Sequence, residues 1–132
     1  MEEVTTLKTI TLDASTISLR SDGIIKIEIK PNTTLKLIDG QEMVKAFAEI
    51  GDSKKYPLLF IAGDFALANA KARYYASGKE ANQFTIASVF VVKSIAQKLM
   101  GNAYITFNKP ITPTKILTNE DEAVKWLKTF IS

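Results

Sequence analysis

The side chains on which much enzyme chemistry depends are missing from this sequence. Its 132 residues include neither cysteine nor histidine. Without cysteine the chain has no thiol nucleophile, disulfide or thiolate metal site, and without histidine it has no Ser-His-Asp triad and no imidazole ligand. Paired carboxylates occur only near the N-terminus and in the first turn of the last predicted helix, where the helix dipole favours them. We therefore predict no catalytic residues, no metal site and no cofactor.

The polar groups that remain as candidates for binding follow three predicted strands. Ligands of open α/β sheets bind outside the carboxyl ends of the strands. The loops expected there contain Asp64, Phe65, Lys93, Ser94, Asn108 and Lys109. Lys93 and Ser94 begin a predicted helix, whose free N–H groups suit an anion. The alternative is that Asp64 and Ser94 are only helix caps and that the lysines are only solvated. An enzyme that uses Asp64 and Lys93 is the least favoured hypothesis, because both would have to face one pocket within ~3–4 Å.

A second candidate for binding combines an arginine with aromatic rings. Arginine occurs only at Arg20 and Arg73, although lysine is plentiful, and Arg73 is followed by Tyr74 and Tyr75. A planar guanidinium among aromatic rings suits a stacked or bidentate contact with a ligand. The alternative is that the tyrosines pack on the sheet and that Arg73 pairs with a surface carboxylate.

The middle of the chain is basic, within a net charge of +3. Residues 65–119 contain Glu80 as their single acidic residue, against these basic ones: Lys71, Arg73, Lys79, Lys93, Lys98, Lys109 and Lys115. Such a segment suits phosphates, anionic lipid or an acidic partner. However, the charges are spread over several elements and no nucleic-acid motif accompanies them. We do not expect nucleic acid as a partner.

Hydrophobic patterning predicts an α/β fold with a mixed sheet of five to six strands and about four helices. Residues 16–132 form the predicted domain, and residues 1–15 are an arm or an outer strand. A hairpin is expected first, with a type I′ turn at Asp22-Gly23. Further strands are predicted at residues 58–62, 84–92 and 104–107. Helices are predicted from an N-cap at Asp39 to Gly51, over 65–76, from Ser94 to Gly101 and after Asn119.

A proline-punctuated loop over residues 108–118 is longer than most connections in α/β units. Its prolines restrict the backbone, so we predict an ordered segment that packs on the edge of its own sheet or on a second copy of the chain. The apolar contacts of that interface would be Ile111, Ile116 and Leu117, with Lys109 and Lys115 facing water or an acidic partner. The alternative is a loop that only returns the chain to the last helix.

The order of these elements resembles the STAS-like (SpoIIAA-like) superfamily, most closely an uncharacterised bacterial branch of it. The resemblance covers residues 16–131 and is most particular in three segments: Asn108-Lys109-Pro110, Pro113-Thr114-Lys115 and Asn119 to Leu127. In members that antagonise anti-sigma factors, a serine within an Asp-Ser-Ser/Thr-Gly motif after the third strand is phosphorylated. Here that segment is Gly63-Asp64-Phe65-Ala66-Leu67, which has no hydroxyl group, so the phosphorylation switch is not carried over.

The resemblance implies a non-catalytic interaction or regulatory module that binds another protein or a second copy of itself. The alternative is a carrier of a small apolar or lipid-like ligand, as in a related branch that resembles lipid-transfer domains. A buried, elongated apolar cavity would favour the carrier, and a solid core with a flat apolar patch would favour the interaction module. The acidic N-terminus lacks the apolar region of a secretory signal, and the longest apolar run is far shorter than the ~20 residues of a membrane span. We therefore predict a cytoplasmic location and no membrane segment.

Overall fold

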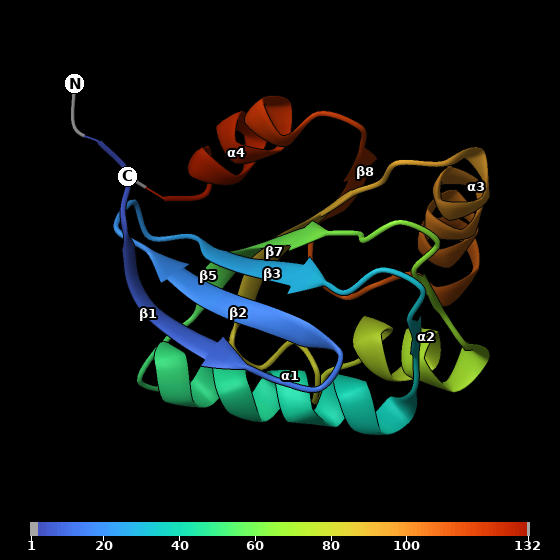
Figure 1. Cartoon of the computed structure of the whole chain (residues 1–132), viewed down its shortest axis with the longest axis horizontal. Coiled ribbons are helices and arrows are strands. Elements are labelled where there is room, and N and C mark those ends of the chain that lie inside the picture. The colour runs from blue at the N-terminus through green and yellow to red at the C-terminus, as the bar shows by residue number, and fades with distance from the viewer. Residues whose placement is uncertain (1–2, 132) are drawn as a thin grey trace.

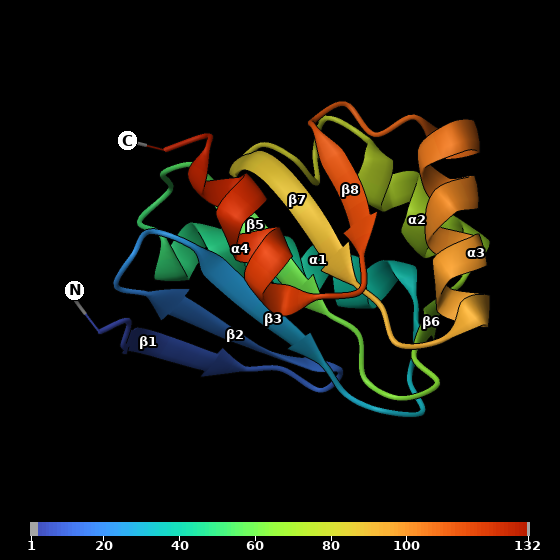
Figure 2. The same ribbon diagram turned by 90° about the horizontal axis from the view of Figure 1, so that it is seen from above.

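The computed structural model describes residues 3–131 and contains one six-stranded mixed sheet (Figures 1 and 2). The strand order is β1-β2-β3-β5-β7-β8. Neighbours pair antiparallel from β1 to β3 and parallel from β3 to β8. The strands are β1 (Thr6–Thr11), β2 (Ser15–Arg20), β3 (Ile25–Ile29), β5 (Tyr56–Ile61), β7 (Thr85–Val91) and β8 (Thr114–Leu117). The predicted α/β class with a mixed sheet is confirmed.

Helices cover both faces of this sheet. Figure 1 shows α1 and α2 below the sheet, α4 above it and α3 beyond the β8 edge. The helices are α1 (Leu37–Ile50), α2 (Ala70–Ser77), α3 (Ile95–Ala103) and α4 (Glu120–Lys128), and a π-helical turn, η1 (Tyr104–Asn108), continues α3. A second, two-stranded parallel sheet joins β4 (Thr34–Leu35) to β6 (Leu67–Ala68). No helix in residues 3–131 is long and apolar enough to cross a membrane.

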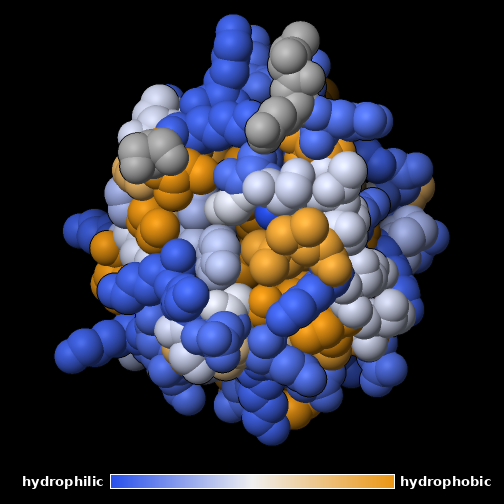
Figure 3. Space-filling model, turned by 90° about the vertical axis from the view of Figure 1, so that its left-hand side faces the viewer, coloured by the Kyte–Doolittle hydropathy of each residue, from blue (hydrophilic) through white to orange (hydrophobic). Residues whose placement is uncertain are grey.

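Each face of the sheet has its own apolar core. The alternating isoleucines of the hairpin, such as Ile17 and Ile27, point toward α1, where Phe47 and Ile50 meet them. On the opposite face Leu59 packs against Leu127 of α4. Because β5 and β7 are covered on both sides, their sequences are continuous apolar runs rather than alternating ones. The face shown in Figure 3 is mainly hydrophilic, with apolar patches between the polar side chains.

The hairpin turn differs from the predicted type I′ turn. Of its residues only Gly23 has a positive φ, +87°. The Gly23 N–H donates to the Arg20 carbonyl, and the Arg20 N–H donates to Ile24. This is a type I turn followed by a glycine bulge, in which one residue, not two, has to be left-handed. The sequence was compatible with either an arm or an outer strand in residues 1–15, and residues 6–11 of this segment form edge strand β1.

Two predicted helix starts are wrong by a few residues. Helix α1 begins after Lys36, and Asp39 lies within its first turn, where its carboxylate accepts the Lys36 N–H at 2.8 Å. The helix predicted over residues 65–76 begins only at Ala70, because Leu67 and Ala68 pair with β4 and the Asn69 side chain caps the helix. The tertiary pairing overrides a helix-forming sequence.

The predicted strand at residues 104–107 is wrong, and the last strand lies inside the predicted loop. Helix α3 runs through Gly101, which does not end it, and continues as η1 until Lys109 takes a left-handed φ of 50°. A Cβ on Gly101 would lie 2.8 Å from the Ile116 side chain, so this glycine allows the close approach of β8. Short apolar runs such as residues 104–107 fit a helix and a strand equally well by pattern.

An apolar cavity under the parallel half of the sheet

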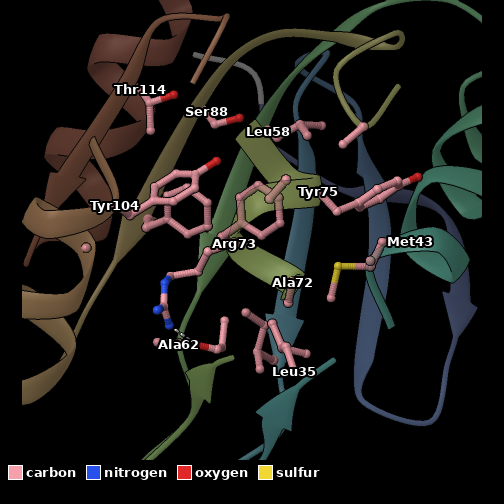
Figure 4. A pocket seen from close by; sticks show the side chains of 18 of the residues that line it. Leu35, Met43, Leu58, Ala62, Ala72, Arg73, Tyr75, Ser88, Tyr104 and Thr114 are labelled. Carbon is pink, nitrogen blue, oxygen red and sulfur yellow. Dashed lines mark hydrogen bonds between the residues drawn. The ribbon is translucent and has the colours of Figure 1, made fainter. Parts of the chain in front are cut away.

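A cavity of about 160 Å³ lies between the parallel strands and the helices α1, α2 and α3. Figure 4 shows side chains of the strands, of α1 and α2, and of η1, which continues α3, pointing into it. Leu35, Ala62 and Arg73 lie at one end, and Ser88 and Thr114 lie at the other. The walls are overwhelmingly apolar. Helices α1 and α2 contribute Met43, Val44, Phe47, Ala72, Tyr75 and Ala76, and the strands contribute Leu58, Phe60, Phe90 and Ile116.

Two stacked aromatic rings form the sheet side of this cavity. Phe60 of β5 and Phe90 of β7 are cross-strand partners, with ring centroids 4.5 Å apart and ring planes at 14°. Tyr104 of η1 meets Phe90 edge-on at 6.0 Å. Both phenylalanines lie on central strands, yet they are only half-buried. Helix α2 packs mainly on α1 and η1, and the two rings stay partly exposed toward the cavity.

The polar groups of the cavity are few and largely uncharged. Thr85 is 3% exposed, and its Oγ1 has no hydrogen-bond partner within residues 3–131. Burial raises the pKa of the Tyr104 phenol well above its ordinary value, so this group is neutral throughout the physiological range. Arg73 and Lys36 are the charged groups of the lining. The cavity therefore suits an apolar molecule and carries positive charge where it is charged at all.

Gln97 fastens α3 to the loop after β5. Its side chain is 2% exposed and accepts the Lys93 N–H at 2.8 Å through Oε1. Its Nε2 donates to the carbonyls of Gly63 and Ala66, both at 2.9 Å. The Ser94 hydroxyl accepts the Gln97 N–H at 3.1 Å, as the predicted N-cap does. These contacts fix the part of α3 that closes the cavity on the β8 side.

The candidate residues at the carboxyl ends of the strands lie outside this cavity. Asp64 and Lys93 form an ion pair at 3.6 Å, with both side chains more than half exposed, beside a shallow surface depression. Phe65 is 78% exposed and has a left-handed φ of 63°. Asn108 and Lys109 end η1 and precede β8. These two residues therefore lie toward the amino ends of the parallel strands, whereas Asp64 and Lys93 follow the carboxyl ends, and the candidate polar residues do not converge on one site.

The arginine–tyrosine candidate is divided between the cavity and the surface. Arg73 lines the cavity and is half-buried, whereas Tyr74 is 77% exposed. Tyr75, not Tyr74, lines the cavity. Among residues 3–131 Arg73 forms no ion pair with a carboxylate.

The predicted interface residues belong to edge strand β8 and to the loop that precedes it. Ile116 packs on Gly101 and lines the cavity, and Leu117 is half-buried against the α4 side. Ile111 is 60% exposed, and the Lys115 ammonium lies 5.0 Å above the Trp126 ring. Residues 114–117 of this segment are extended, and the side chains of Ile116 and Leu117 pack within the molecule.

Sequence reasoning missed Phe60, Phe90, Tyr104 and Gln97 as residues of the site. The two phenylalanines are indistinguishable from ordinary core residues in an apolar strand. A glutamine in a helix with apolar neighbours offered a weak signal, because a buried amide needs several partners.

The mixed sheet with an antiparallel edge hairpin and helices on both faces defines a SpoIIAA-like fold. One similar solved structure is that of an uncharacterised protein from the DUF3478 family, from Shewanella loihica PV-4, and it is described as having a SpoIIAA-like fold. The similarity covers 94% of the present chain and 93% of the other chain, with a TM-score of 0.57 and 9% sequence identity. The chain belongs to the family described as Domain of unknown function (DUF7793), whose model matches residues 17–131. No curated protein matches the sequence.

Proposed function

We propose that this protein is a non-catalytic binding domain that holds a small apolar ligand in the cavity under its sheet. The observation that carries the proposal is the pair Phe60 and Phe90, which are accessible from the cavity although they occupy central strands. Aromatic side chains in such a position are normally covered by a helix, because uncovered apolar area costs roughly 25 cal/mol per Å². A ligand that stacks on these rings supplies the missing cover.

The size of the cavity sets the size of the ligand. Its volume of about 160 Å³ is similar to that of an engineered cavity of about 150 Å³ that takes up benzene. Burial of six carbons at about 0.8 kcal/mol each gives about 5 kcal/mol, before the cost of association. We therefore expect a six-carbon chain or a single ring to bind with a Kd of about 1 mM.

The experiment is a titration of the isotope-labelled protein with hexan-1-ol, followed by the amide resonances in NMR. We expect saturable shifts confined to residues that line the cavity. In the variant Ala76→Leu the new side chain occupies the cavity, so the saturable shifts disappear while the protein stays folded. The control Ala70→Leu places the same side chain on an exposed position of the same helix and retains binding. The absence of saturable shifts in the wild type, or their persistence in Ala76→Leu, would contradict the proposal.

A second candidate function is association with another protein or with a second copy, for which α3 provides the observation. Ile95, Leu99 and Phe107 are 79%, 65% and 80% exposed along α3 and η1. Apolar side chains of this exposure in one helical segment are typical of an interaction surface. The test is the molar mass in solution by light scattering. A dimer that Leu99→Lys converts into a folded monomer would support association, and a wild-type monomer would exclude the second copy as partner.

A further inference from the structure

The charges in the cavity indicate which apolar ligand it accepts. Arg73 and Lys36 line the cavity, and no aspartate or glutamate of the described part of the chain does. Asp39, which follows Lys36 by three residues, is engaged by the Lys36 backbone N–H and does not line the cavity. An arginine that is partly removed from water needs hydrogen-bond acceptors, because a desolvated charge without partners is costly.

The guanidinium of Arg73 and the backbone of Lys36 lie at the same end of the cavity, beside the small β4–β6 sheet. One nitrogen of the Arg73 guanidinium, Nη1, donates to the carbonyl of Ala68. Ala68 is the cross-strand partner of Leu35, the residue that precedes Lys36. Figure 4 shows the guanidinium next to Ala62 and Leu35, away from the end that carries Ser88 and Thr114.

The contact with Ala68 leaves a particular edge of the guanidinium available. Since Nη1 is in use, the Nε–H and Nη2 groups remain as two parallel donors, and no hydrogen bond from either is present in residues 3–131. The other arginine of the chain shows what this edge binds. Arg20 holds both carboxylate oxygens of Asp22 through Nε at 3.1 Å and Nη2 at 2.7 Å. Two parallel N–H donors match the two oxygens of a carboxylate.

We propose that the ligand of the cavity is a small amphiphilic carboxylate, with its apolar body on the Phe60–Phe90 rings and its carboxylate on the Nε–Nη2 edge of Arg73. This inference rests on the proposed function, since it requires that the cavity is occupied at all. Lys36, an exposed residue of the lining, adds a second positive charge to the protein around the cavity. The uncharged opposite end, where Thr85, Ser88 and Thr114 lie, receives the far end of the apolar body.

The test compares two probes with the same six-carbon body, hexanoate and hexan-1-ol, in the NMR titration described above. We expect hexanoate to bind the wild type about tenfold more tightly, the usual effect of a hydrogen bond to a charged group. The Arg73 Nε–Hε resonance shifts on addition of hexanoate and not on addition of hexan-1-ol. Arg73→Gln lowers the affinity for hexanoate until it no longer exceeds the affinity of the same variant for hexan-1-ol. The control Lys71→Gln, an exposed residue of the same helix outside the lining, keeps the preference.

The outcomes separate this inference from the proposed function. If neither probe binds, the proposed function itself fails. If both bind equally well to the wild type, or if the preference for hexanoate survives Arg73→Gln, the cavity binds apolar ligands and the assignment of the carboxylate to Arg73 is wrong. If Arg73→Gln loses both probes, the Nε–Hε resonance of the wild type decides, and its failure to respond to hexanoate overturns the inference.

Discussion

Replacement of Gln97 by leucine tests whether this one side chain holds the α3 wall of the cavity in place. Gln97→Leu keeps the approximate volume and removes three hydrogen bonds, to Lys93 N–H, Gly63 O and Ala66 O. A buried polar group that loses its partner costs about 1–3 kcal/mol. Lys93 is exposed and Gly63 is half-buried, so water replaces part of the loss there, whereas Ala66 is only 4% exposed. We expect a total loss of about 2–4 kcal/mol in the free energy of unfolding.

Urea unfolding followed by circular dichroism measures this loss. With a denaturant dependence of about 2 kcal/mol per M, the midpoint falls by about 1–2 M. The control Gln83→Leu removes an amide whose hydrogen bond to Glu80 is exposed, and its midpoint stays within about 0.3 M of the wild type. Equal midpoints for Gln97→Leu and Gln83→Leu would refute the reasoning.

The isosteric variant Gln97→Glu separates hydrogen bonding from packing. Its carboxylate faces the two carbonyls to which the Gln97 Nε2 donates, so at neutral pH it destabilises the protein at least as much as leucine does. Protonation restores one donor, which places the folded-state pKa of the new carboxyl above its ordinary value of about 4.3. Its stability relative to the wild type is therefore highest at low pH and falls as the pH rises through that pKa. A deficit that does not change with pH would contradict this account of the site.

Two further predictions concern the loop after β5 and the turn of the β2–β3 hairpin. Gly63→Ala places a Cβ 2.4 Å from the Ile29 carbonyl oxygen, so the backbone has to move, and we expect the free energy of unfolding in a urea titration to fall by about 1–3 kcal/mol. The control is Gly78→Ala, whose Cβ would meet nothing closer than 3.6 Å and should leave the stability unchanged. Equal effects of the two substitutions would contradict the steric argument. Burial raises the pKa of the Asp22 carboxyl, but the hydrogen bond and charge of Arg20, with the charge of Lys128, outweigh it and hold that pKa below its ordinary value of 3.8. The stability contributed by Asp22 is therefore present above that value and lost as the pH falls through the folded-state pKa. The difference in thermal unfolding midpoint between the wild type and Asp22→Asn should shrink below about pH 4. A difference that stays constant with pH would refute this argument.

Local patterns in the sequence are sufficient for the elements that depend on neighbours close in the chain. The hairpin strands around Gly23, the apolar strands β5 and β7, and the caps Ser94 and Asn119 were predicted correctly because alternation, turn chemistry and capping act over a few residues. The order of these elements also predicts the SpoIIAA-like fold, which the similarity to a solved structure confirms.

The cavity and the last strand were decided only by the tertiary structure. Residues 104–107 fit a helix or a strand by pattern, and they are helical because α3 continues past Gly101 while the proline-flanked residues 114–117 take the free edge of β7. Strand β6, which contains Leu67, pairs with β4, so α2 begins late and packs on α1. Phe60 and Phe90 stay partly exposed toward the cavity, and Arg73 lies at one end of it. A sequence pattern records which residues are apolar, but whether a helix covers them depends on contacts between segments far apart in the chain.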